Sequence, residues 1–324
     1  MTSVKLKRGL PHDVKTVAGR HRETLGDGTT VFGFIRRQAA RLRRIGRNRT
    51  AGTYMEALSS LMKFREDKDL RFKSLDSDMI EQYEAWMKAR RLCRNTTSFY
   101  MRILRTIYNQ AVAAGIAIGS NPFRNVYTGI DKTAKRAITL QEIRRLKNLD
   151  LSGDGKLEFA RDIFLLSFYL RGMSFVDLAY LRKSDLNSGF LTYTRRKTGQ
   201  QLVIRWERQM QLFVDKYRSP ATRYLLPIIL REDGTEEAQY RNRMLLINRR
   251  LKKIADRAGL HIPLTLYVAR HSWASIAKAK NIPISVICGA MGHDSESTTQ
   301  IYLASIQTNT IDNANRSILR DLNK

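Results

Sequence analysis

The chain has 324 residues, 43% of them hydrophobic, which is enough for two domains with separate cores. It carries 58 Lys and Arg against 30 Asp and Glu, a formal net charge of +28. Such an excess favours a polyanionic partner, nucleic acid first and an anionic membrane surface second. No apolar run approaches the roughly 20 residues of a membrane-spanning helix, and the N-terminus lacks the apolar core of a signal peptide. The composition predicts a DNA-associated protein of the cytoplasm, on the nucleoid and without membrane contact.

The sequence contains no pattern typical of a metal or nucleotide site. Its two cysteines, Cys93 and Cys288, are far apart and have no CxxC or histidine partner at ligand spacing. A Walker sequence, an HExxH motif and an acidic pair at metal spacing are all lacking. We therefore expect neither a metal nor a cofactor, and Cys288 is interpreted as a small buried hydrophobic residue.

The N-terminal segment, residues 1–29, is basic and has no apolar periodicity. It is interpreted as a flexible tail, which is either solvated disorder or an arm that follows the DNA backbone. Between residues 30 and 127 the apolar positions repeat at helical spacing and predict a bundle of four helices. The first begins at Val31 and carries a basic back opposite its apolar stripe; the arginines are Arg36, Arg37, Arg41, Arg43 and Arg44.

Capping residues mark the ends of the later helices in this bundle. The second helix covers Tyr54 to Phe64, and Asp76 or Ser77 is expected to cap the third. The fourth is expected to be capped by residues 95–97 and to end at Gly115. A charged, non-periodic stretch at 128–137 is interpreted as a linker, so that two domains can close around DNA.

A second domain is predicted from residue 138 to 324. Thr139 and Glu142 form a capping-box pattern, and an apolar helix over 157–169 leads to Arg171, where Gly172 interrupts it. An unpaired buried arginine costs several kcal/mol, so Arg171 needs an acidic partner or an anionic ligand. Asp177 is the available acidic partner.

Two strands are predicted at 190–194 and 201–205, with a turn at 195–200 that carries Lys197. Further helices are expected near 210–217 and around residues 247–258. The fold class is therefore mainly α with a small β-sheet: an N-terminal helical domain and an α+β domain.

Three short segments near the C-terminus bring together residues suited to work on a phosphate. They are Tyr267 to His271 with Arg270, Met291-Gly-His293, and Thr298-Thr-Gln-Ile-Tyr302. Arginine matches two phosphate oxygens, histidine exchanges protons near neutrality, and tyrosine supplies an oxygen nucleophile. For Tyr267 a role as a buried core residue is an equally open interpretation.

These motifs together resemble the tyrosine recombinase (phage integrase) family over residues 30 to 324. The segment 266–274 is especially similar to integrases and DNA invertases of Bacteroides-type bacteria. Residues 169–178 resemble the first arginine box of the family, and 194–199 its lysine hairpin. The resemblance implies a SAM-like core-binding domain at 30–127 and a recombinase catalytic domain at 138–324.

The resemblance also implies roles for individual residues. Tyr302 is expected to attack a DNA phosphate to give a 3′-phosphotyrosine, while Arg171 and Arg270 hold the phosphate oxygens. Lys197 is expected to act as the general acid and His293 to assist the nucleophile. Tyr267 stands where the family most often has histidine, so it can hydrogen-bond a phosphate oxygen but cannot carry a proton near pH 7. Where many members have Glu three residues after the first arginine, this chain has Ser174, which makes Asp177 the candidate support for Arg171.

The expected function is site-specific recombination of double-stranded DNA, as integration, excision or inversion within a mobile element. The amphipathic segment after residue 310 packs either on its own domain or, as the resemblance implies, on a neighbouring protomer of a homotetramer assembled on DNA. Accessory DNA-bending proteins are further candidate partners. The alternatives are a type IB topoisomerase and a DNA-binding regulator without catalysis. The short N-terminus slightly favours a simple invertase over an integrase with distant arm sites.

Overall fold

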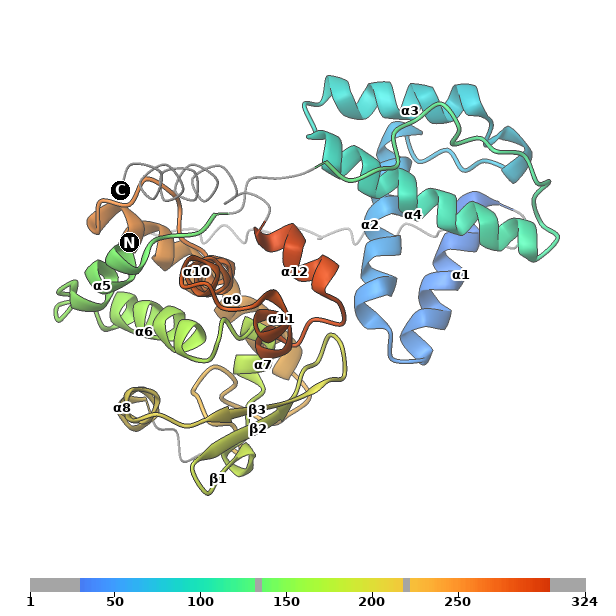
Figure 1. The fold of residues 1–324 in the computed structure, drawn as a ribbon. Helices are drawn as coiled ribbons and strands as arrows, with labels where there is room; N and C mark the ends of the chain where they lie inside the picture. The colour runs from blue at the N-terminus through green and yellow to red at the C-terminus, as the bar shows by residue number, and fades with distance from the viewer. Residues whose placement is uncertain (1–29, 132–135, 218–221, 304–324) are drawn as a thin grey trace, which may run out of the picture. The chain divides into compact units, whose positions relative to one another are not determined.

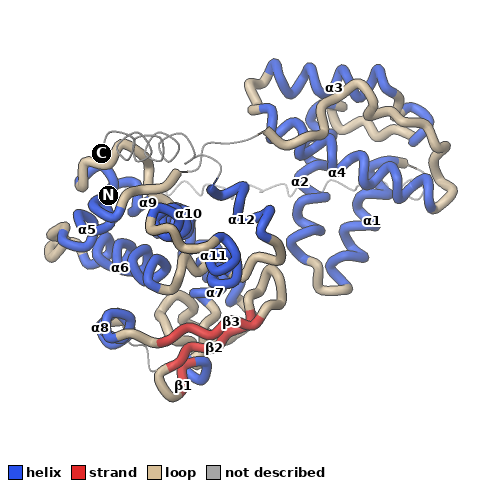
Figure 2. The backbone as a smooth tube through the Cα atoms, viewed as in Figure 1, coloured by secondary structure: helices blue, strands red, loops and turns tan. Residues whose placement is uncertain are grey.

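The computed structural model describes residues 30–131, 136–217 and 222–303, and only the backbone of 301–303. The chain forms two compact units, Met1–Lys132 and Thr133–Lys324. Both units are largely helical (Figure 1), and a small antiparallel sheet lies in the second (Figure 2). The predicted fold class, mainly α with a small sheet, is confirmed. The expected N-terminal tail and the C-terminal amphipathic helix lie outside the described residues.

Unit 1 is a helical bundle around an aromatic core. Its helices are α1 (Val31–Arg44), α2 (Asn48–Phe64), η1 (Phe72–Ser74), α3 (Ser77–Ala89) and α4 (Arg94–Ala113). Tyr83 is fully buried and donates its hydroxyl proton to Ser60 at 2.6 Å, so its polar atom is satisfied inside the core. The arginines predicted on the back of α1 are all exposed. The amphipathic pattern is confirmed, and it leaves a basic helix face open to solvent.

The helix caps in unit 1 follow the prediction in one case and differ in another. Asp76 caps α3 by accepting from the backbone N–H of Met79 at 2.9 Å. The predicted cap of α4 at residues 95–97 is wrong, because the helix already begins at Arg94 after Cys93. The amide of Asn95 instead pairs with the backbone of Asp131, accepting at 2.8 Å and donating at 3.1 Å. A long-range partner has thus replaced the local cap.

Unit 2 surrounds one buried helix. Its helices are α5 (Leu140–Asn148), α6 (Gly155–Tyr169), α7 (Phe175–Ala179), η2 (Lys183–Asp185), α8 (Arg208–Lys216), α9 (Glu236–Arg257), α10 (Leu266–Ala279), α11 (Ile284–Met291) and α12 (Glu296–Leu303). Its strands are β1 (Leu186–Asn187), β2 (Phe190–Thr194) and β3 (Gln201–Arg205), in the order β1-β2-β3. The capping box predicted at Thr139 and Glu142 is confirmed at the start of α5.

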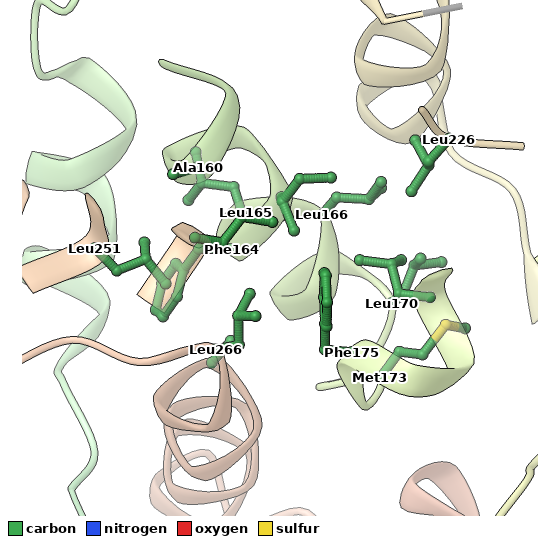
Figure 3. Packing of buried hydrophobic residues seen from close by; sticks show 14 of the residues in the cluster. Ala160, Phe164, Leu165, Leu166, Leu170, Met173, Phe175, Leu226, Leu251 and Leu266 are labelled. Carbon is green, nitrogen blue, oxygen red and sulfur yellow. The ribbon is translucent and has the colours of Figure 1, made fainter. Parts of the chain in front are cut away.

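Helix α6 is the centre of the unit 2 core and packs against α9 and α10. Its second half is buried and apolar on most sides; Phe164 is fully buried and Leu165 is only 1% exposed. Figure 3 shows Phe164 beside Leu251 of α9, with Leu266 of α10 close to it. Since α6 ends at Tyr169, this packing fixes the position of the turn that follows, at Arg171 and Gly172.

The small sheet presents one face to the same core. Leu191 pairs with Ile204 and Tyr193 with Leu202, and all four side chains are buried. The bounds predicted for β2 and β3 are those observed, whereas β1 and α7 were not predicted because two and five residues carry too little periodicity. The register leaves residues 195–200 as the connecting turn. Within the described ranges, no helix combines the length and hydrophobicity needed to cross a bilayer.

Replacement of Leu165 by Ala is expected to lower the free energy of unfolding of unit 2 by about 2–5 kcal/mol, since it leaves a cavity in a closely packed core. Leu212→Ala is the matched control, because Leu212 on α8 is 60% exposed. Hydrogen exchange of unit 2 peptides in a urea titration measures both. Equal effects of the two variants would contradict the central place of α6.

Candidate active site

Arg270 is the buried centre of the site. It lies in the second turn of α10 and is only 3% exposed. Its Nη1 donates to the carbonyl of Gly172 at 2.8 Å, and its Nη2 donates to the carbonyl of Met291 at 2.6 Å. The same Nη2 lies 2.8 Å from Nε2 of His293. One guanidinium therefore joins α10 to the turn after α6 and to the turn after α11.

Within the described residues the charge of Arg270 is not neutralised by an ion pair, although the Asp177 carboxylate attracts it electrostatically. Among the described residues, no ion pair includes Arg171, Arg195 or Arg270. Burial, together with the positive charge of Arg195, lowers the pKa of Arg270 to about 10. Its Nε–H is buried without a hydrogen-bond partner. Buried cations are normally compensated, so this arrangement favours an anionic ligand at the site.

His293 is held in one tautomer by its neighbours. A guanidinium only donates, so Nε2 of His293 accepts from Arg270, and the proton is on Nδ1. That nitrogen donates to Oγ1 of the fully buried Thr299 on α12, at 2.8 Å. Burial, with the positive charges of Arg270, Arg195 and Lys197, lowers the pKa of His293 to about 4. The free protein therefore holds a neutral imidazole against a cation.

Arg171 lies in a left-handed turn that directly follows α6. Its φ is 59°, that of Gly172 is 70°, and its Nη1 donates to the carbonyl of Val203 on β3 at 3.3 Å. The proposed support of Arg171 by Asp177 is wrong in this structure. The buried Asp177 carboxylate accepts from the hydroxyl of Ser174 at 2.6 Å and from the backbone N–H of Arg196 at 2.9 Å. Asp177 therefore holds the β2–β3 turn, because α7 presents it to that turn.

Lys197 lies exposed in the β2–β3 turn, as predicted. The turn is closed by two backbone hydrogen bonds of 2.8 Å, from Arg195 N–H to the Gln200 carbonyl and from Gly199 N–H to the Arg195 carbonyl. The guanidinium of Arg196 lies over the ring of Tyr180, 4.0 Å from its centroid. Lys197 is thus carried on a turn that both Asp177 and Arg196 attach to the body of unit 2.

No role was predicted for Arg195 from the sequence, where it falls in the turn at 195–200. It is 6% exposed and donates from Nη1 to the carbonyl of Gly292, directly before His293. A signal was available in the strand period. Leu191, Tyr193 and Arg195 are two residues apart, so they fall on the same, inward face of β2.

Tyr267 lies at the rim of the site and is 51% exposed. The interpretation as a buried core tyrosine is therefore wrong for its side chain. Its ring meets the ring of the buried His271 edge-on, with centroids 4.6 Å apart. Together with Arg270 it lines a cavity of about 250 Å³ beside α7 and α9.

Tyr302 lies in α12, which begins at Glu296. Position 302 comes three residues after Thr299, so the two positions fall on the same side of the helix. The Tyr302 side chain is outside the described part of the structure. Within that part, the site unites Arg171, Arg270, His293, Tyr267 and the Lys197 turn, and no three His, Cys, Asp or Glu side chains form a metal-binding group.

Comparison with known proteins identifies the family. Residues 30–128 match the phage integrase SAM-like domain, and residues 137–308 match the phage integrase family model. Since the second match alone covers more than half of the chain, the protein belongs to the phage integrase family.

Individual relatives are distant. The tyrosine recombinase XerA of Pyrococcus furiosus is 28% identical over 179 residues, 53% of this chain and 58% of the relative. A tyrosine recombinase of Pseudothermotoga lettingae is 22% identical over 278 residues, 82% and 91% of the two chains. A lambda integrase dimer bound to a COC′ core site has a similar fold, with a TM-score of 0.65 at 17% identity over 87% of this chain and 79% of that one.

Gly172→Ala is expected to destabilise unit 2 more than Gly189→Ala. Both glycines have a positive φ, 70° and 78°, so both variants carry the roughly 1–2 kcal/mol of a left-handed alanine. A Cβ at position 172 would lie 2.6 Å from the Cα of Arg270, whereas position 189 has open space. Urea unfolding of the two variants measures the difference. Equal losses would contradict the close approach of α10 to this turn.

Stability should fall with decreasing pH through His293. Its pKa is about 4 in the folded chain against 6.5 normally, so below pH 6.5 the unfolded chain binds a proton that the folded chain does not. Well above pH 6.5 no free energy of unfolding is lost through this group. The loss reaches about 2 kcal/mol at pH 5 and increases further as the pH approaches 4. Urea unfolding at pH 5 and pH 8 tests it, since His293→Gln should show a smaller loss between these values. An identical loss in both proteins would contradict the buried neutral imidazole.

Proposed function

We propose that the protein is a site-specific tyrosine recombinase that cleaves and rejoins double-stranded DNA through a covalent 3′-phosphotyrosine. The observation that carries the proposal is the buried Arg270, which has no ion-pair partner among the described residues and lies beside neutral His293. Membership of the phage integrase family and a net charge of +28 support DNA as the anion. Among related folds, a lambda integrase tetramer is bound to a Holliday junction and XerH to a palindromic difH substrate.

In the proposed reaction the Tyr302 oxygen attacks the scissile phosphorus, and the bond from phosphorus to the 5′ oxygen breaks. Arg171 and Arg270 stabilise the negative charge that develops on the non-bridging oxygens. Lys197 gives its proton to the leaving 5′ oxygen, and a 5′ hydroxyl later attacks the phosphotyrosine to restore the DNA. The bond energy is kept in the phosphotyrosine, so the reaction needs no external source of energy.

His293 and Tyr267 complete the proposed site. In the free protein Nε2 of His293 is held by Arg270, 2.8 Å away. A phosphate that accepts from Arg270 competes for that contact and frees the imidazole to take the tyrosine proton. The half-exposed Tyr267 lies beside Arg270 and donates a hydrogen bond to a phosphate oxygen.

The assembly and domain roles belong to the same proposal. Residues 30–127 form the core-binding domain, 138–324 the catalytic domain and 128–137 the linker between them, while the basic residues 1–29 follow the DNA backbone. Four chains assemble on two DNA sites, and the segment after residue 310 docks on a neighbouring protomer. We place the protein on the nucleoid, where accessory DNA-bending proteins assist it.

The test starts from DNA that the protein selects itself. Genomic fragments retained by the purified protein identify its site, and a nicked suicide version of that site is incubated with it before a denaturing gel. The wild type should form a covalent protein–DNA adduct and Tyr302→Phe should form none. Tyr169→Phe is the control, since Tyr169 packs on Phe213 away from the site and should leave the adduct unchanged.

Two other outcomes would contradict the proposal. Salt-sensitive binding of the selected site without an adduct would make the chain a DNA-binding regulator. An adduct with relaxation of supercoils, but without strand exchange between two sites, would make it a topoisomerase. In the recombinase, Arg270→Ala should slow adduct formation by on the order of 100- to 1,000-fold.

A further inference from the structure

Arg195 occupies a position for which the chemistry above has no role. It follows β2 directly, on the inward face with Leu191 and Tyr193, and is 6% exposed. No ion pair of the described residues includes it, and its Nε–H is buried without a partner. Burial of an arginine without a carboxylate costs several kcal/mol, so a merely structural contact would be better made by an apolar residue.

Arg195 and Gly292 both contribute to the contact between them: Arg195 donates a hydrogen bond, and Gly292 permits a close approach. Nη1 of Arg195 donates to the Gly292 carbonyl. Gly292 has φ 62°, and a Cβ there would lie 2.9 Å from Cδ1 of Leu202, 3.1 Å from Cδ of Arg195 and 3.3 Å from Oε1 of Gln200. The base of the β2–β3 turn therefore approaches the turn after α11 as closely as a glycine allows.

The two turns joined by this contact carry two of the proposed reacting groups. Lys197 is two residues after Arg195, and His293 is one residue after Gly292. Arg270 binds the preceding carbonyl, that of Met291, at 2.6 Å. The two guanidinium groups thus bind successive carbonyls of the turn after α11. Arg270 binds that of Met291, and Arg195, at the base of the β2–β3 turn, binds that of Gly292.

We propose that Arg195 is a positioning residue. It connects the β2–β3 turn, which carries Lys197, to the turn after α11, which carries Gly292 and His293, so that the general acid and His293 are held in one fixed geometry at the scissile phosphate. This inference rests on the proposed recombinase chemistry. Loss of Arg195 leaves Lys197 chemically intact but free to move away from the leaving oxygen. The defect is therefore one of proton delivery, and it should disappear when the leaving group needs no proton.

The experiment compares two suicide substrates under single-turnover conditions with saturating DNA. One has the natural 5′ oxygen; the other has sulfur in its place and leaves as a thiolate without taking a proton. Arg195→Met should slow adduct formation about 10- to 100-fold with oxygen and no more than about 3-fold with sulfur. Lys197→Met should show the same pattern, Arg270→Met should be slow with both, and Arg195→Lys, which keeps a donor, should stay within about 5-fold of wild type.

A second measurement does not depend on the reaction. Hydrogen exchange of residues 195–200 in the DNA-free protein should be faster in Arg195→Met than in wild type, because the turn is released from Gly292. Arg205→Met is the matched control, since Arg205 is an exposed arginine at the end of β3 that lies farther along the strand from this turn. It should leave the exchange of this turn close to wild type.

Different failures have different meanings. No adduct from the wild type would reject the recombinase chemistry, whereas unchanged exchange in Arg195→Met would reject the Arg195 contact alone. If Arg195→Met is slow with both oxygen and sulfur, Arg195 acts on phosphate charge instead of on Lys197, which overturns the inference. Full activity with both substrates overturns it as well.

Discussion

Unit 2 is organised around one constraint: the guanidinium of Arg270 is buried and forms no ion pair with a carboxylate of the described residues. Backbone carbonyls of Gly172 and Met291 and the imidazole of His293 accept its hydrogen bonds instead. These acceptors bind the two Nη atoms, but among the described residues the Nε–H has no acceptor and the positive charge stays in place, with that of Arg195 nearby. An anionic ligand would compensate both charges, so the electrostatics of the site favour an anion.

The fold serves this constraint by bringing distant segments to one point. The buried α6 fixes the left-handed turn at Arg171 and Gly172, and α10 approaches that turn so closely that only glycine fits. The sheet carries the β2–β3 turn with Lys197. Asp177 connects this turn to α7, and Arg195 connects it to the turn after α11. A displacement of any of these turns would change the position of a charged group relative to Arg270. The close approaches at Gly172 and Gly292 keep the turns in place.

Much of this organisation could be predicted from the sequence, where local pattern decides structure. Alternation gave the bounds of β2 and β3, and the pair Thr139 and Glu142 gave the start of α5, because these signals act between neighbouring residues. The candidate residues Arg171, Arg270 and His293 were found from their motifs. The hydrogen-bond partners of polar side chains that are distant in sequence could not be predicted. Asn95 pairs with Asp131 instead of capping a helix, and Asp177 binds Ser174 and the Arg196 backbone instead of Arg171. Arg195 was overlooked because the alternation of the strand was not continued beyond residue 194.

The central claim is that Arg270 and its neighbours receive a DNA phosphate. The most direct measurement is an experimental structure of the Tyr302→Phe variant bound to its own DNA site. The account predicts a backbone phosphate within hydrogen-bond distance, about 3 Å, of the guanidinium groups of Arg171 and Arg270, with Lys197 beside the 5′ oxygen of that phosphate. A complex in which the DNA lies on the protein but no phosphate reaches Arg270 would contradict the account.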